Sequence, residues 1–220
     1  MTRRTLVLSL AALAAVIYGL GLADGVPALR LAIKPVPVLA MAWAVRAGPR
    51  SSYARAVLAG LIACAIGDVL LDLVFPLGML AFLIGHVFYT SAYVGEDRRP
   101  RPLVALPFAA WCVAAFVTLR PGLGVLTIPV ALYSLAIGAM MWRAAARVTR
   151  AAPRDVWLAV AGAILFAISD TLIAFNKFHE PIANARYWII SLYWLGQLGI
   201  TLSALTGARA RADARVSARP

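Results

Sequence analysis

Two aspartates lie in near-copies of one apolar segment, and this placement suits acid–base chemistry. Asp68 belongs to Ala59–Leu70 and Asp170 to Ala161–Leu172, and Ala, Gly, Ile, Ala, Ile, Asp and Leu recur at matching positions. A carboxylate in hydrocarbon costs roughly 2.5–3.5 kcal/mol even on insertion scales. Of two close carboxyls, one tends to hold a proton at neutral pH, so one group can donate a proton while the other activates water. We therefore expect the aspartates to act as a pair.

Further polar residues lie in the apolar segments at a similar expected depth, and together they predict a polar cavity. They are the candidate catalytic residue His86 and the candidate substrate-binding residues Lys34, Asp72, Tyr89, Asn176, Tyr193 and Gln197. Structural alternatives stay open for them: Lys34 can extend to the interface, and Gln197 can join two helices. Asp68 and Asp170 can also form a purely structural buried pair neutralised by Lys34 or His86. Ionisable groups inside a membrane more often serve function, which favours the catalytic interpretation.

A metal site with two Asp ligands and one His ligand is another interpretation of the same residues. It is weaker, because the chain has only two histidines and no clustered ligand motif such as HExxH. The sequence also has no Gly-rich phosphate loop and no GxSxG nucleophile motif. We therefore expect carboxyl chemistry with no cofactor and no metal.

The elements that position these residues are expected to be membrane-spanning helices. Of the 220 residues, 63% are hydrophobic, which is well above the apolar share of soluble domains. Their mean hydropathy is +0.85. The apolar runs predict eight helices near residues 5–22, 28–45, 54–74, 77–95, 103–119, 123–142, 156–176 and 186–206. The predicted fold is an all-α integral membrane protein, with one domain over residues 1–207 and a disordered basic tail over 208–220.

The net charge of +12 is distributed in a way that indicates a membrane rather than nucleic acid. Arginines collect at both termini and in alternate connections, which is the positive-inside pattern with cytoplasmic termini. We expect a multi-pass protein of the cell inner membrane that contacts membrane lipids. A signal peptide starting at Arg3-Arg4 is disfavoured, because cleavage would break the even span count. The opposite side has few basic residues: Arg30, Lys34, Arg120, Lys177 and Arg186.

The similarity between the two aspartate segments indicates an internal repeat. The segments lie four predicted helices apart, so both run in the same direction through the membrane. A parallel 4+4 duplication about an axis along the membrane normal would produce this pattern. The alternative is that small and apolar residues common in membrane helices coincide.

The chain resembles the YhhN-like, TMEM86 family of membrane proteins, known as lysoplasmalogenases. The resemblance rests on short motifs whose order and spacing are more specific than any one of them. These motifs are Lys34-Pro35, Gly67-Asp68 with Leu70-Leu71, Phe82-x-x-Gly85-His86-x-x-Tyr89, Phe166-x-x-Ser169-Asp170 with Phe178 downstream, and Tyr193-Trp194-x-Gly196-Gln197. At the Gly196 position the family more usually has Ala.

The resemblance implies an eight-span enzyme that hydrolyses the vinyl ether bond of lysoplasmalogens. Its products would be a fatty aldehyde and glycerophosphoethanolamine or glycerophosphocholine. A vinyl ether resists base and yields to acid, since protonation of the alkenyl carbon gives an oxocarbenium ion that water captures. Asp68 and Asp170 would share the acid and base roles in an order left open. The remaining roles implied are proton tuning or relay by Asp72 or His86, phosphate pairing by Lys34, and headgroup orientation by Tyr193 and Gln197.

Two other functions remain open from the sequence. A transporter or binding protein for a lysolipid or small solute also suits a repeat with a polar site at the membrane midplane. A hydrolase of another lipid class, with or without a metal, is the second alternative. Release of aldehyde from a lysoplasmalogen would distinguish the vinyl ether hydrolase from a transporter or binding protein. Sensitivity to chelation, together with activity on an ester or amide lipid, would indicate a hydrolase of another lipid class. Headgroup preference and oligomeric state do not follow from the sequence.

Overall fold

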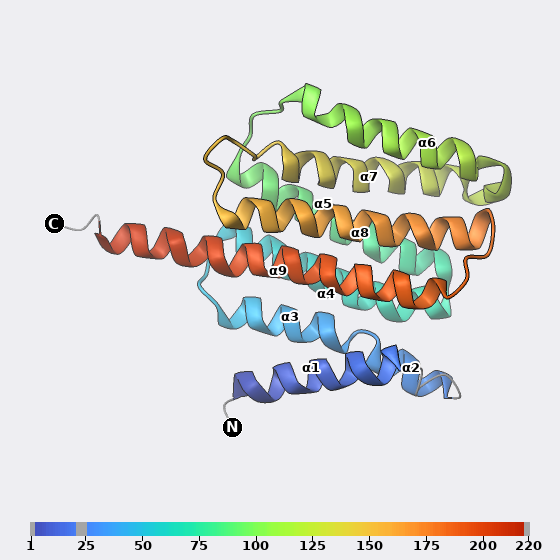
Figure 1. Ribbon diagram of the computed structural model, residues 1–220, viewed down its shortest axis with the longest axis horizontal. Coiled ribbons are helices and arrows are strands. Elements are labelled where there is room, and N and C mark those ends of the chain that lie inside the picture. Colours follow the sequence, from blue (N-terminus) through green and yellow to red (C-terminus); the bar gives the residue numbers. More distant parts are fainter. Residues whose placement is uncertain (1–2, 21–25, 218–220) are drawn as a thin grey trace.

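In a computed structural model, the chain folds as long helices that lie roughly side by side (Figure 1). The structure describes residues 3–20 and 26–217, and these contain no strand. The helices are α1 (Arg3–Gly19), α2 (Pro27–Ile33), α3 (Val36–Ala47), α4 (Ser52–Leu73), α5 (Phe75–Glu96), α6 (Leu106–Leu123), α7 (Thr127–Ala145), α8 (Arg154–Phe178) and α9 (Ala185–Ser217). Short 3₁₀ turns, η1 (Pro102–Ala105) and η2 (Gly124–Leu126), precede α6 and α7. The predicted all-helical fold is confirmed, and every predicted helix overlaps an observed one.

The apolar helices make this chain a multi-pass membrane protein. Six segments of the described residues are long and apolar enough to cross a membrane: Pro27–Ala47, Ser52–Leu73, Phe75–Glu96, Pro102–Ala145, Arg154–Phe178 and Ala185–Gly207. The segment Pro102–Ala145 contains both α6 and α7, which lie side by side after the chain reverses near η2 (Figure 1). The helix α1 has 17 residues. The count of eight spans and the cytoplasmic termini stay predictions.

The second predicted span, residues 28–45, is two helices rather than one. The helix α2 ends at Ile33 and α3 begins at Val36, with Lys34 and Pro35 between them. Proline has no backbone N–H to donate and its ring obstructs the preceding turn, so it interrupts a helix at this point. Pro37 is tolerated because it lies in the first turn of α3. The break places Lys34 at the junction, beside the end of α4.

Two helix pairs, α4–α5 and α8–α9, have the most extensive contacts in the bundle. Small residues allow these approaches. A side-chain carbon at Gly60 would meet the Tyr89 ring at 2.3 Å, and one at Gly162 would meet the Gly196 carbonyl at 2.7 Å. These two pairs hold Asp68 on α4 and Asp170 on α8.

The Arg-rich end of the bundle is tied together by buried charges. The Arg143 guanidinium donates to the carbonyls of Asp97, Arg99 and Pro100, which holds the connection between α5 and η1. Arg147 lies 3.8 Å from Asp155 at the start of α8. The Arg147–Asp155 pair is thus at the opposite end of α8 from Asp170.

The last helix is longer than the sequence predicts. Residues 208–217 continue α9 as helix, whereas the sequence analysis predicts disorder from residue 208. Alanine and arginine are strong helix formers, which explains the difference. Residues 218–220 lie outside the described residues, and the assignment of residues 1–207 to one domain stays a prediction.

Candidate active site

A polar cavity of about 240 Å³ lies at the end of the bundle away from the Arg-rich connections. Residues of α1, α2, α4, α5, α8 and α9 line it. Asp68 and Asp170, the aspartates of the two matching segments, both line the cavity, although they lie four predicted spans apart in the chain. The sequence-predicted site residues that line this cavity are Lys34, Asp68, Asp72, Asp170, Asn176 and Tyr193.

Asp68 is buried, with 1% of its surface exposed. The Tyr193 hydroxyl on α9 donates to Asp68 Oδ2 at 2.9 Å. The other oxygen, Oδ1, is buried and has no hydrogen-bond partner among the described residues. A buried polar atom without a partner is costly, so a water or substrate group in the cavity is the expected partner for Oδ1.

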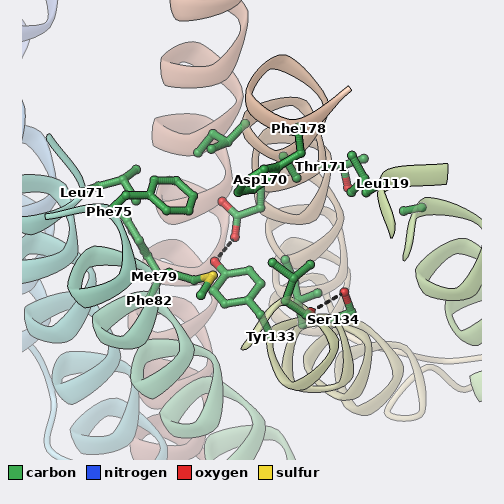
Figure 2. A pocket seen from close by; sticks show the side chains of 15 residues that line it. Leu71, Phe75, Met79, Phe82, Leu119, Tyr133, Ser134, Asp170, Thr171 and Phe178 are labelled. Carbon is green, nitrogen blue, oxygen red and sulfur yellow. Dashed lines mark hydrogen bonds between the residues drawn. The ribbon is translucent and has the colours of Figure 1, made fainter. Parts of the chain in front are cut away.

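Asp170 is held by residues from two further helices. The Tyr133 hydroxyl on α7 donates to Asp170 Oδ2, as Figure 2 shows. His86 on α5 is fully buried, and its Nε2 lies 3.6 Å from the same oxygen. Tyr133 was not predicted as a site residue, because its only signal in the sequence is a tyrosine within a mostly apolar predicted span.

Asp170 also lines a second, apolar cavity of about 70 Å³ (Figure 2). Its walls are mostly hydrophobic side chains, including Phe75, Met79 and Leu119. The residues that line both cavities are Leu71, Phe82, Asp170 and Ile173. Since Asp170 alone of these four can ionise, it marks the border between a charged cavity and an apolar one.

Lys34 is paired with Asp72 in the wall of the polar cavity. Their Nζ and Oδ1 atoms are 2.9 Å apart, and the two side chains are 10% and 26% exposed. This contact ties the break between α2 and α3 to the end of α4. In the structure the Lys34 amine contacts Asp72, and its pairing with a substrate phosphate stays a prediction.

Three predicted site residues do not reach either cavity. The Tyr89 hydroxyl donates to Gln197 Oε1 at 2.7 Å, and both side chains are fully buried. His86 lies behind Asp170 and packs against the rings of Tyr133 and Phe166. These side chains lie behind the residues that line the cavities, and their predicted roles in the site stay predictions. Asn176 does line the polar cavity, and its Oδ1 accepts a hydrogen bond from the backbone of Ile182 at 2.8 Å.

A metal site would need several His, Cys, Asp or Glu side chains close together. Among the side chains that the structure describes, no three of His, Cys, Asp or Glu are grouped so that they could hold an ion. Asp68, Asp170 and His86 therefore do not converge as a ligand set. What the cavity does offer is two carboxyls, each hydrogen-bonded on one oxygen by a tyrosine.

Known proteins match this chain over most of its length. A model of the YhhN family matches residues 29–204. The human lysoplasmalogenase TMEM86B is 32% identical over 188 residues, covering 82% of this chain and 77% of that protein. The human lysoplasmalogenase TMEM86A is 36% identical over 160 residues, or 69% of this chain and 66% of that protein. A lysoplasmalogenase of Mycobacterium bovis is 33% identical over 175 residues, or 73% and 65%. No solved structure matches the chain.

Proposed function

This chain belongs to the YhhN family, and from that premise we propose that it is a membrane lysoplasmalogenase. Its substrate is a lysoplasmalogen, and its products are a fatty aldehyde and a glycerophospho-headgroup. The observation that carries the proposal is the position of Asp170 between the charged and the apolar cavity. In a lysoplasmalogen the vinyl ether joins the polar glycerol to the single apolar chain. A lipid that occupies both cavities therefore has its scissile bond beside Asp170.

The polar cavity suits a headgroup rather than a whole lipid. Its volume of about 240 Å³ is below the roughly 300–1,000 Å³ of most small-molecule sites. The apolar cavity takes the start of the alkenyl chain, and the surrounding hydrocarbon of the membrane takes the rest.

Asp170 is the proton donor in this proposal, and Asp68 is the base. The Asp170 carboxyl transfers its proton to the second alkenyl carbon, which leaves an oxocarbenium ion at the first. Water adds to that carbon while Asp68 takes the water proton, and a hemiacetal results. In its collapse, Asp68 returns this proton to the departing glycerol oxygen and Asp170 accepts the hemiacetal hydroxyl proton. Aldehyde and alcohol leave, and both carboxyls regain their starting protonation.

The tyrosines and His86 position the carboxyls in this scheme. Tyr133 donates to Asp170 and Tyr193 donates to Asp68, so one oxygen of each carboxyl is held in place. His86, buried behind Asp170, restricts where that side chain can turn. General acid and base groups must be within hydrogen-bond reach of the proton that they transfer, and such restraint keeps them there.

For the topology, we propose eight spans with both termini in the cytoplasm of a cell whose inner membrane holds the protein. The spans are α1, α2 with α3, and each helix from α4 to α9. The Arg-rich connections then face the cytoplasm, and the polar cavity opens toward the outer side. A parallel 4+4 repeat is supported by the similar α4–α5 and α8–α9 pairs. Across these pairs, Asp68 on α4 meets Tyr193 on α9, and Asp170 on α8 meets His86 on α5.

The function is tested by giving the purified protein a lysoplasmalogen and, separately, the saturated alkyl ether of the same headgroup and chain length. We expect aldehyde from the first only, because a saturated ether has no double bond to protonate. Aldehyde is measured by mass spectrometry after trapping as a hydrazone.

Two results would contradict the proposal. Binding of the lysoplasmalogen, seen as a thermal shift, without aldehyde release would favour a transporter or binding protein. Hydrolysis of an ester or amide lipid in place of the vinyl ether would favour a hydrolase of another class.

A further inference from the structure

We propose that Arg30 and Arg186 form a subsite for the phosphodiester of the substrate headgroup. Both arginines line the polar cavity that contains Asp68 and Asp170. In the sequence they stand out only as basic residues on the less charged side of the membrane. The inference rests on the proposed function and adds the part of the site that recognises phosphate.

The charges of the cavity indicate which groups can serve this purpose. Its basic residues are Arg30, Lys34 and Arg186, and Lys34 is engaged by Asp72 at 2.9 Å. Among the residues whose side chains the structure describes, no carboxylate forms an ion pair with Arg30. Arg30 is also only partly buried, so its guanidinium charge is open to an anion that enters the cavity.

Arg186 is held in place by aromatic rings. Its guanidinium carbon lies 5.4 Å from the centre of the Tyr18 ring and 4.8 Å from that of Tyr187. Its Nη2 donates to the Tyr187 hydroxyl at 3.2 Å. Cation–π contacts orient the planar guanidinium. The Arg186 guanidinium therefore has a fixed orientation at the cavity wall.

The two arginines come from different helices but line the same cavity. Arg30 is on α2 and Arg186 is on α9, and Tyr18 of α1 lines the cavity with them. A phosphodiester shares one negative charge between two non-bridging oxygens, and guanidinium groups bind such oxygens through paired N–H donors. With the alkenyl chain in the apolar cavity, the headgroup is left in the polar one, where these arginines lie.

The test compares Arg30→Gln and Arg186→Gln with the wild-type protein on two substrates. One is a lysoplasmalogen, and the other is the phosphate-free 1-alkenylglycerol with the same chain. Each variant should raise KM for the lysoplasmalogen by roughly 10- to 100-fold, the size of one lost hydrogen bond to a charged group, with little change in kcat. Cleavage of the alkenylglycerol should stay at the wild-type rate, which also shows that the variant is folded.

Two matched variants sharpen the comparison. Arg30→Lys keeps the charge but loses the paired donors, so it should recover part of the affinity. Arg120→Gln removes an exposed arginine at the end of α6 that does not line the cavity. This variant should leave KM and kcat unchanged for both substrates.

An equal rise in KM for both substrates, or no change in KM for either, would contradict the proposed phosphate subsite. It would leave the proposed hydrolase function standing. Failure of the wild-type protein to cleave either alkenyl substrate would instead refute the proposed function. The two failures are therefore distinguishable in one set of assays.

Discussion

Asp170→Asn is expected to fold normally and to release aldehyde at least roughly 100-fold more slowly than the wild-type protein, since general acid catalysis typically contributes 10²–10⁴-fold. The amide has nearly the shape of the carboxyl and still accepts a hydrogen bond from Tyr133, so packing around this residue should persist. It cannot supply the proton that the alkenyl carbon needs. The measurement is the initial rate of aldehyde release per amount of folded protein, determined by size exclusion and thermal unfolding.

The matched control is Asp155→Asn, which removes the other buried aspartate of α8. Asp155 is 8% exposed and pairs with Arg147 at the opposite end of the helix, away from both cavities. Per folded molecule, this variant should keep wild-type activity, although its thermal stability should fall because a buried ion pair is broken. An Asp170→Asn protein within threefold of the wild-type rate would show that Asp170 is not the acid.

Asp68→Asn is expected to give the second large loss, again at least roughly 100-fold in kcat, because water would have no base to activate it. Among the described residues, Oδ1 of Asp68 has no hydrogen-bond partner, and this is the oxygen that we expect to contact the water. Binding of the lipid should change little, so the loss should fall on kcat rather than on KM.

Tyr193→Phe is the informative companion to Asp68→Asn. It keeps the carboxyl but removes the hydroxyl that donates to Oδ2 of Asp68, so the base is present but less well oriented. The expected loss is roughly tenfold, the lower end of what one hydrogen bond to a charged group contributes. Equal damage from both substitutions would mean that Asp68 serves the packing of α4 against α9 rather than the reaction.

The fold was largely readable from the sequence because membrane helices are marked by length and apolarity. Runs of about 20 apolar residues separated by arginine-rich or proline-marked connections predicted eight helices, and each overlaps an observed one. The break at Lys34-Pro35 was signalled by proline, yet the sequence could not say whether the helix would bend or end. That outcome depends on neighbours that satisfy the freed backbone groups.

The candidate site was only partly predictable. Asp68 and Asp170 stood out because charge is rare in apolar segments, and the structure places both on one cavity. The contacts of Lys34 with Asp72 and of Tyr133 with Asp170 join helices far apart in the chain. Such contacts depend on how each helix is rotated about its axis. A strongly apolar helix carries little amphipathic pattern from which to read that rotation.

The central claim is that the two carboxyls act as one catalytic unit, and the double variant Asp68→Asn/Asp170→Asn tests it most directly. Aldehyde release by the double variant should be within roughly threefold of the slower single variant, because removing one member of a catalytic unit already forfeits most of what the unit contributes. A double variant whose loss equals the product of the two single losses would show that the aspartates act independently.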